Sequence, residues 1–126
     1  MTEAFFPYDL DRRYLPIWGP LGVRSGRHGV TVTDDELVAT FGRFRLATPR
    51  ANVDGGHITS GYRWYTSVGL RMSFEDDGLT FGTNRRQGVC IHFVDKVGGV
   101  VPGRRHSALT VTVADCAGLI EAIGGA

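Results

Sequence analysis

The stretch VTVTDDELVATFGRFRLAT, residues 30–48, alternates apolar and polar side chains in three short runs. Alternation with a period of two residues is typical of strands that bury one face. The runs are separated by the acidic residues 34–36 and by Gly42-Arg43, which are turn-forming sequences. The stretch therefore predicts three consecutive antiparallel strands whose apolar side chains face a common core.

The same alternation continues to residue 113. Asp76-Asp77-Gly78 is a strong turn signal between two alternating runs, and loops are expected at residues 52–56 and 96–106. The expected inward rows are Leu70, Met72 and Phe74, then Leu79 and Phe81, then Val89, Ile91 and Phe93, and finally Leu109, Val111 and Val113. These rows predict a mainly β domain of about seven antiparallel strands over residues 29–113.

A short helix is predicted at the C-terminus, over residues 115–123. Asp115 is a favourable N-cap, and Leu119, Ile120 and Ile123 recur at helical spacing. A helix this short is marginal in water on its own, so we expect it to dock against the strands.

Residues 1–28 have a different character, with aromatic side chains crowded among prolines and no regular period. Residues 9–15 are expected to form a helical turn or two that ends at Pro16. The segment is too hydrophobic for a disordered tail, so we expect it to cover an open sheet edge or a barrel mouth. The alternative is that it forms the contact of a homodimer.

Composition places the chain among globular proteins. Its 126 residues are enough for one domain, and 42% of them are hydrophobic. The formal net charge of +1 gives no general attraction to nucleic acid, which is therefore not an expected partner. Two cysteines do not make a disulfide framework, and neither a signal peptide nor a transmembrane segment is recognisable. A reduced, cytoplasmic protein is the expectation.

The order of the predicted elements resembles the bacterial pleckstrin-homology-like (PH-like) domains. The closest local match is residues 37–53, which look like the strand, turn, strand and loop entry of that family. The resemblance implies a partly open barrel, or two orthogonal sheets, with the terminal helix at one end. The first hairpin lacks a basic pattern, so phosphoinositide binding is not implied. A small unrelated barrel or a split sheet packed on a helix is the alternative fold.

A second resemblance covers most of the chain. Residues 78–84, 88–93 and 109–113 are similar to a family of small, uncharacterised actinobacterial proteins. That resemblance implies no activity and no ligand.

Two groups of residues are candidate binding sites. Tyr62, Arg63, Trp64 and Tyr65, together with Trp18, would offer aromatic rings and an arginine to a planar ligand or a partner. Arg85-Arg86, with the basic run at residues 104–106, would suit a phosphate or a carboxylate. The ordinary alternatives are a core tryptophan in a sheet and solvated turns.

Cys90 and His92 lie two apart on one expected strand and so share its outward face. A cysteine beside a histidine is a pattern of nucleophilic catalysis, or of a soft metal site with Cys116 or His106 as a further ligand. A small buried cysteine and a satisfied histidine are far commoner, so neither a catalytic nor a metal-ligating residue is predicted. His28 and His57 stand beside glycine-rich turns, where a histidine can also reach a ligand.

These features together predict a non-catalytic binding module that recognises a protein partner or a small apolar ligand. The predicted surface includes Trp18, residues 62–65, Arg85-Arg86 and His92. The alternative is a small enzyme or a ligand carrier with a pocket between the sheets. The sequence specifies no cofactor.

Overall fold

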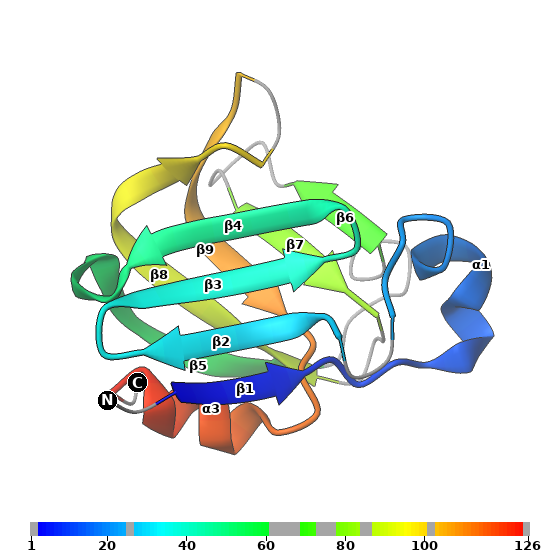
Figure 1. The fold of residues 1–126 in the computed structure, drawn as a ribbon, viewed down its shortest axis with the longest axis horizontal. Coiled ribbons are helices and arrows are strands. Elements are labelled where there is room, and N and C mark those ends of the chain that lie inside the picture. Colours follow the sequence, from blue (N-terminus) through cyan, green and yellow to red (C-terminus); the bar gives the residue numbers. More distant parts are fainter. Residues whose placement is uncertain are drawn as a thin grey trace.

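The computed structural model describes residues 3–24, 27–60, 69–72, 78–83, 87–100 and 103–124. The described residues form two sheets and several short helices (Figure 1). The strands are β1 (Glu3–Pro7), β2 (Gly29–Thr33), β3 (Glu36–Phe41), β4 (Phe44–Pro49), β5 (Val53–Ser60), β6 (Gly69–Met72), β7 (Gly78–Gly82), β8 (Gln87–Gly98) and β9 (Arg105–Val111). The helices are η1 (Arg12–Tyr14), α1 (Leu15–Trp18), η2 (Arg50–Asn52) and α3 (Cys116–Ala122).

The first sheet has four strands in the order β1-β2-β3-β4, all antiparallel. The alternation of residues 30–48 is confirmed here, since Val30, Leu37, Ala39, Phe41 and Leu46 are fully buried. The residues next to them along each strand are at least partly exposed, apart from Gly29, which is buried. Thr48, two residues after Leu46, continues the inward row and is 4% exposed. The prediction of a mainly β chain with a short C-terminal helix is therefore confirmed.

The second sheet has five strands in the order β5-β8-β9-β7-β6. β9 lies between β7 and β8 and runs parallel to β7, although an antiparallel arrangement was expected throughout. Alternation along a strand specifies which side chains face the core, but it does not specify which strand lies next to it. The neighbours of β9 were therefore not determined by the pattern that predicted the strand.

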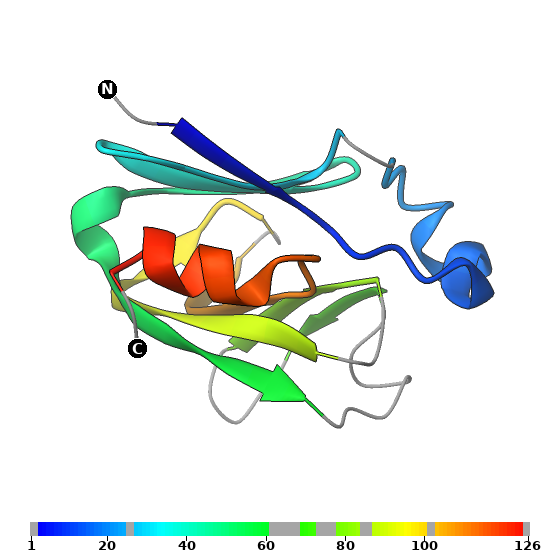
Figure 2. The same ribbon diagram turned by 90° about the horizontal axis from the view of Figure 1, so that it is seen from below.

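The hydrophobic core lies between the two sheets, and α3 lies between them at one side (Figure 2). α3 contacts β1, β5 and β8, so it touches both sheets. Asp115 caps it by accepting a hydrogen bond from the backbone N–H of Gly118 at 2.9 Å. A Cβ atom built on Gly56 of β5 would lie 2.9 Å from the Cδ1 atom of Ile123, so α3 packs on that face of β5.

The N-terminal segment passes from one sheet to the other. β1 pairs with β2 at the edge of the first sheet, and Tyr8 then forms a bridge with Val113 beyond β9. Pro16 does not end a helical turn, as was expected, but lies in the first turn of α1. The first turn is where proline is tolerated, because its missing N–H has no partner within the helix there.

The loop expected at residues 52–56 is largely strand, and strands occupy both ends of the loop expected at residues 96–106. β5 begins at Val53, with a register shift before Gly56, and β8 continues to Gly98 through a second shift after His92. Gly55 has a φ of 85°, a conformation that glycine adopts without strain. The glycines that suggested a loop at residues 52–56 therefore lie in an irregular part of a strand. No helix among the described residues is long and apolar enough to cross a membrane.

Candidate functional site

Two strands of the second sheet bring His57, Cys90 and His92 together on its outer face. On β8 the side chains of Val89, Ile91 and Phe93 are buried in the core, so Cys90 and His92 project from the opposite face. His57 of β5 pairs directly with Cys90 in the antiparallel register. Directly opposed residues project from the same face, and the site therefore lies on the side of the sheet away from α3.

The donor atoms of these side chains are close to one another. Nε2 of His92 lies 3.1 Å from Nδ1 of His57, within hydrogen-bonding distance. The two imidazole rings stack with centroids 5.0 Å apart and an interplanar angle of 23°. The ligand atoms of His57, Cys90 and His92 all lie within 4.8 Å of one another. Two imidazole nitrogens and one sulfur atom thus lie close together on one face of the sheet.

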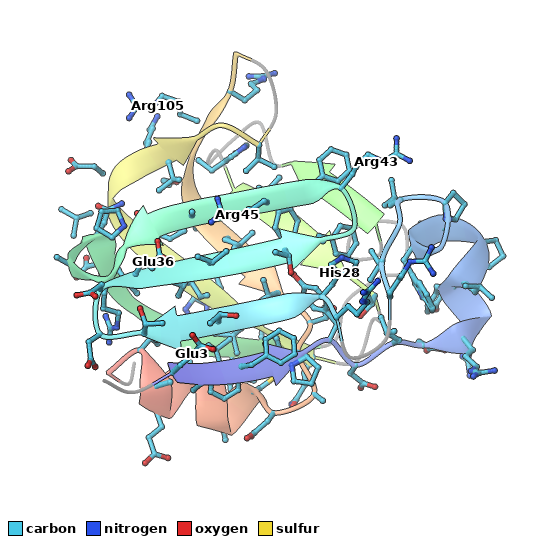
Figure 3. The ribbon with its side chains drawn as sticks, viewed as in Figure 1. Glu3, His28, Glu36, Arg43, Arg45 and Arg105 are labelled. Carbon is cyan, nitrogen blue, oxygen red and sulfur yellow. The ribbon has the colours of Figure 1, made fainter. Side chains whose placement is uncertain are left out.

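The residues of β9 that lie beside this cluster carry no charge. The residues of β9 opposite Cys90 and His92 are Thr110 and Ala108. His57 is exposed and Cys90 is half-buried, so solvent and solutes can reach the site. The outer face of the first sheet differs, because it carries charged side chains such as Glu36 and Arg45 (Figure 3).

His57 is the residue that the sequence placed least well. No metal ligand was predicted, and the metal site weighed as an alternative had Cys116 or His106 beside Cys90 and His92. Among the described residues the third member of the cluster is His57. Cys116 is buried on α3 and donates a hydrogen bond from Sγ to the carbonyl of Val113 at 3.4 Å. Only the β5–β8 register, which the expected loop over residues 52–56 concealed, would have paired His57 with Cys90.

Trp18 is the one predicted aromatic of the binding surface that lies within the described residues. It is buried, and its Nε1–H donates to the backbone carbonyl of Asp11 at 2.9 Å. It lines a small cavity of about 320 Å³ with Leu10, Arg12 and Leu15. Tyr62, Arg63, Trp64, Tyr65, Arg85 and Arg86 lie outside the described residues.

His28 has a local backbone partner. Its Nδ1 accepts a hydrogen bond from the backbone N–H of Arg24 at 2.8 Å. Burial lowers the pKa of His28 below its usual value, and the positive charges of Arg27 and Arg24 lower it further. This nitrogen is therefore engaged in a local turn directly before β2, at the end of the strands of the first sheet (Figure 3).

A groove runs where the two sheets approach each other at the ends of β4 and β8. It has a volume of about 580 Å³ and is wide open to solvent. Its lining residues come from the end of β4, from η2 and from residues 94–98 of β8. Asn52 joins two of the lining segments. Its side-chain amide donates to the backbone carbonyl of Asp95 at 2.9 Å and accepts from the backbone N–H of Asp95 at 2.8 Å.

Comparisons with known proteins add no further constraint. No family model matches the chain, and neither a curated protein nor a solved structure matches it. The geometry of the sites described above is therefore the basis for assigning a function.

Proposed function

We propose that this protein is a non-catalytic binding module whose ligand site is formed by His57, Cys90 and His92. The observation that carries the proposal is the convergence of the three donor atoms within 4.8 Å on an accessible sheet face. β8 is hydrogen-bonded on both sides, by β5 and β9, so the backbone holds the donors in a fixed arrangement. Sites built on strands position their side chains more accurately than sites on loops.

The partners of the two imidazoles favour binding over nucleophilic catalysis. A cysteine nucleophile works with one histidine as a base, and a third group orients that histidine. Here the ring nitrogen of His92 faces the ring nitrogen of His57, so each imidazole has the other as its partner. Two imidazoles around one sulfur form a donor set for a bound species.

Native mass spectrometry of the freshly purified, tag-free full chain tests this proposal. We expect the wild-type chain to carry a bound species, and the double variant His57→Gln, His92→Gln to lose it. His28→Gln is the matched control, since it changes a histidine that lies outside the cluster. The proposal is contradicted if the double variant retains the species of the wild-type chain, or if no species is found under native conditions and no added ligand binds at the cluster.

A second candidate, a ligand carrier with a pocket between the sheets, is favoured by the groove at the ends of β4 and β8. Its lining includes residues from both sheets and an exposed apolar side chain, Val94. In this case Val94→Arg would release the bound species, and the double histidine variant would retain it. A small apolar ligand bound instead in the cavity beside Trp18 would be released by Leu15→Arg. The double histidine variant would retain that ligand.

A relation to the PH-like domains is also proposed. A four-stranded antiparallel sheet followed by a second sheet and a C-terminal helix supports it. β7 pairs in parallel with β9, which departs from the antiparallel arrangement expected throughout. A structural relative of this chain should contain the same parallel pair.

A further inference from the structure

We infer that the species bound by His57, Cys90 and His92 is a divalent transition-metal ion of the zinc type. The inference rests on the proposed function, because it names the ligand of the same site. Imidazole nitrogen and thiolate sulfur are the donors that Zn²⁺ prefers, whereas Mg²⁺ and Ca²⁺ prefer oxygen.

The spacing of the two imidazole nitrogens fits one ion. Zinc lies about 2.0–2.1 Å from imidazole nitrogen and about 2.3 Å from sulfur in a tetrahedral site. Two nitrogens bound in this way are about 3.3 Å apart, as the tetrahedral angle requires. Nε2 of His92 and Nδ1 of His57 already lie 3.1 Å apart, so their separation needs to change by only a few tenths of an ångström.

The two nitrogens that face each other, Nδ1 of His57 and Nε2 of His92, are assigned as ligands together with the nearby Sγ of Cys90. The hydrogen bond between the two nitrogens requires a proton on one of them. An ion replaces that proton, which moves to the other nitrogen of the same ring or to solvent. The thiol also loses its proton when sulfur binds the metal, so binding releases about one proton from Cys90 for each ion.

The charge of the surroundings suits a cation held by one thiolate. The residues that face the cluster from β9 are Thr110 and Ala108, neither of which carries a charge. The thiolate of Cys90 is then the counter-charge within the cluster, and the site carries one net positive charge with Zn²⁺. Three protein ligands leave the fourth position to water or to a donor atom from a partner.

Binding would also fix an edge strand. β5 is at the edge of the five-stranded sheet, and its pairing with β8 is interrupted by the shift between Val53 and Gly56. An ion held by His57 on one strand and by Cys90 and His92 on the other joins the two strands next to this irregularity. We therefore expect the ion to stabilise the folded chain, as any ligand does that binds only the native state.

Titration of the metal-free, tag-free full chain with Zn²⁺ tests the inference, with Co²⁺ as a spectroscopic probe of sulfur ligation. We expect one ion per chain, a sulfur-to-cobalt charge-transfer absorption and a rise in the melting temperature. Each of His57→Gln, Cys90→Ser and His92→Gln should weaken binding by at least about tenfold. His28→Gln and Cys116→Ser should leave the affinity within about twofold of wild type.

The outcomes separate this inference from the proposed function. Circular dichroism of each variant checks that the sheets have formed, since all three substitutions lie on a solvent-accessible face. Unchanged zinc affinity in folded His57→Gln and His92→Gln overturns the metal assignment, as does cobalt binding without the sulfur absorption. If no metal binds but the double histidine variant still loses an organic species, the metal inference is wrong and the binding module stands. If no metal binds and the double histidine variant loses no bound species, both the metal inference and the proposed function are contradicted.

Discussion

The rings of Phe41 and Phe81 are stacked across the core, with centroids 5.2 Å apart and planes within 5° of parallel. Phe41 belongs to β3 of the first sheet and Phe81 to β7 of the second, and both are fully buried. Tyr8 packs edge-on against Phe41 with a centroid separation of 5.6 Å. This aromatic group therefore joins the N-terminal segment and the two sheets in one contact.

Replacement of either stacked ring should be among the most costly core substitutions. We expect Phe41→Ala and Phe81→Ala each to lower the free energy of unfolding by about 3–5 kcal/mol, because each leaves a cavity in a closed core. Urea denaturation measures this change, and the double variant should reveal a coupling of about 0.5–1.5 kcal/mol. Phe5→Ala is the control, since Phe5 is 42% exposed and its loss should cost about 1 kcal/mol or less. Equal costs for Phe5 and Phe41 would contradict the packing described.

The Tyr8 hydroxyl should contribute little to the free energy of unfolding. It is buried, has no hydrogen-bond partner among the described residues, and burial raises the pKa of the phenol well above its usual value. Tyr8→Phe removes this desolvated group and keeps the ring contact with Phe41. We expect the free energy of unfolding to stay the same or to increase by up to about 1 kcal/mol. Tyr8→Ala, which also loses the ring, should instead cost about 3 kcal/mol, and a comparable loss in Tyr8→Phe would show that the hydroxyl is bonded.

A buried pair of threonines should behave in the opposite way. Oγ1 of Thr83 donates to the carbonyl of Asp9 at 2.8 Å and lies 2.9 Å from Oγ1 of Thr112. Thr83→Val keeps the shape but leaves the Asp9 carbonyl without this donor, so we expect a loss of about 1–3 kcal/mol on urea denaturation. Thr83→Ser keeps the hydroxyl and should cost less. A neutral Thr83→Val would mean that the hydroxyl does not hold the N-terminal segment.

His28 should make stability depend on pH in the mildly acidic range. Burial is the largest cause that lowers its pKa, and the charges of Arg27 and Arg24 act in the same direction. Because the pKa is lowered in the folded state, the unfolded chain binds the proton at a higher pH than the folded chain does. The stabilisation is therefore complete above the pKa of the unfolded state, about 6.5, and is lost as the pH falls through the lower pKa of the folded state. Imidazole titration by NMR should place the His28 midpoint below 6.5. His28→Gln should remove this part of the pH dependence, and a midpoint above 6.5 would contradict it.

The fold was predictable where each residue's environment follows from its neighbours in sequence. Alternation in residues 30–48 predicts which side chains are buried, because adjacent residues of a strand face opposite sides. The position of β9 between β7 and β8 was not predictable, because it depends on contacts between distant strands. The cluster shows both cases. Cys90 and His92 share a face by local spacing, whereas His57 joins them only through the register of β5 on β8.

The two cysteines should differ in reactivity. Cys116 is 2% exposed, and burial raises the pKa of its thiol, with Asp115 and Asp9 adding to the effect. Because the thiolate is the reactive form, Cys116 should react with an aromatic disulfide reagent only when the chain unfolds. Cys90 is half-buried on the outer face and should react in the native protein. One fast thiol is therefore expected in wild type and in Cys116→Ser, and none in Cys90→Ser. Saturating Zn²⁺ should slow the fast thiol of Cys116→Ser, and a fast thiol that zinc leaves unaffected would contradict ligation by Cys90.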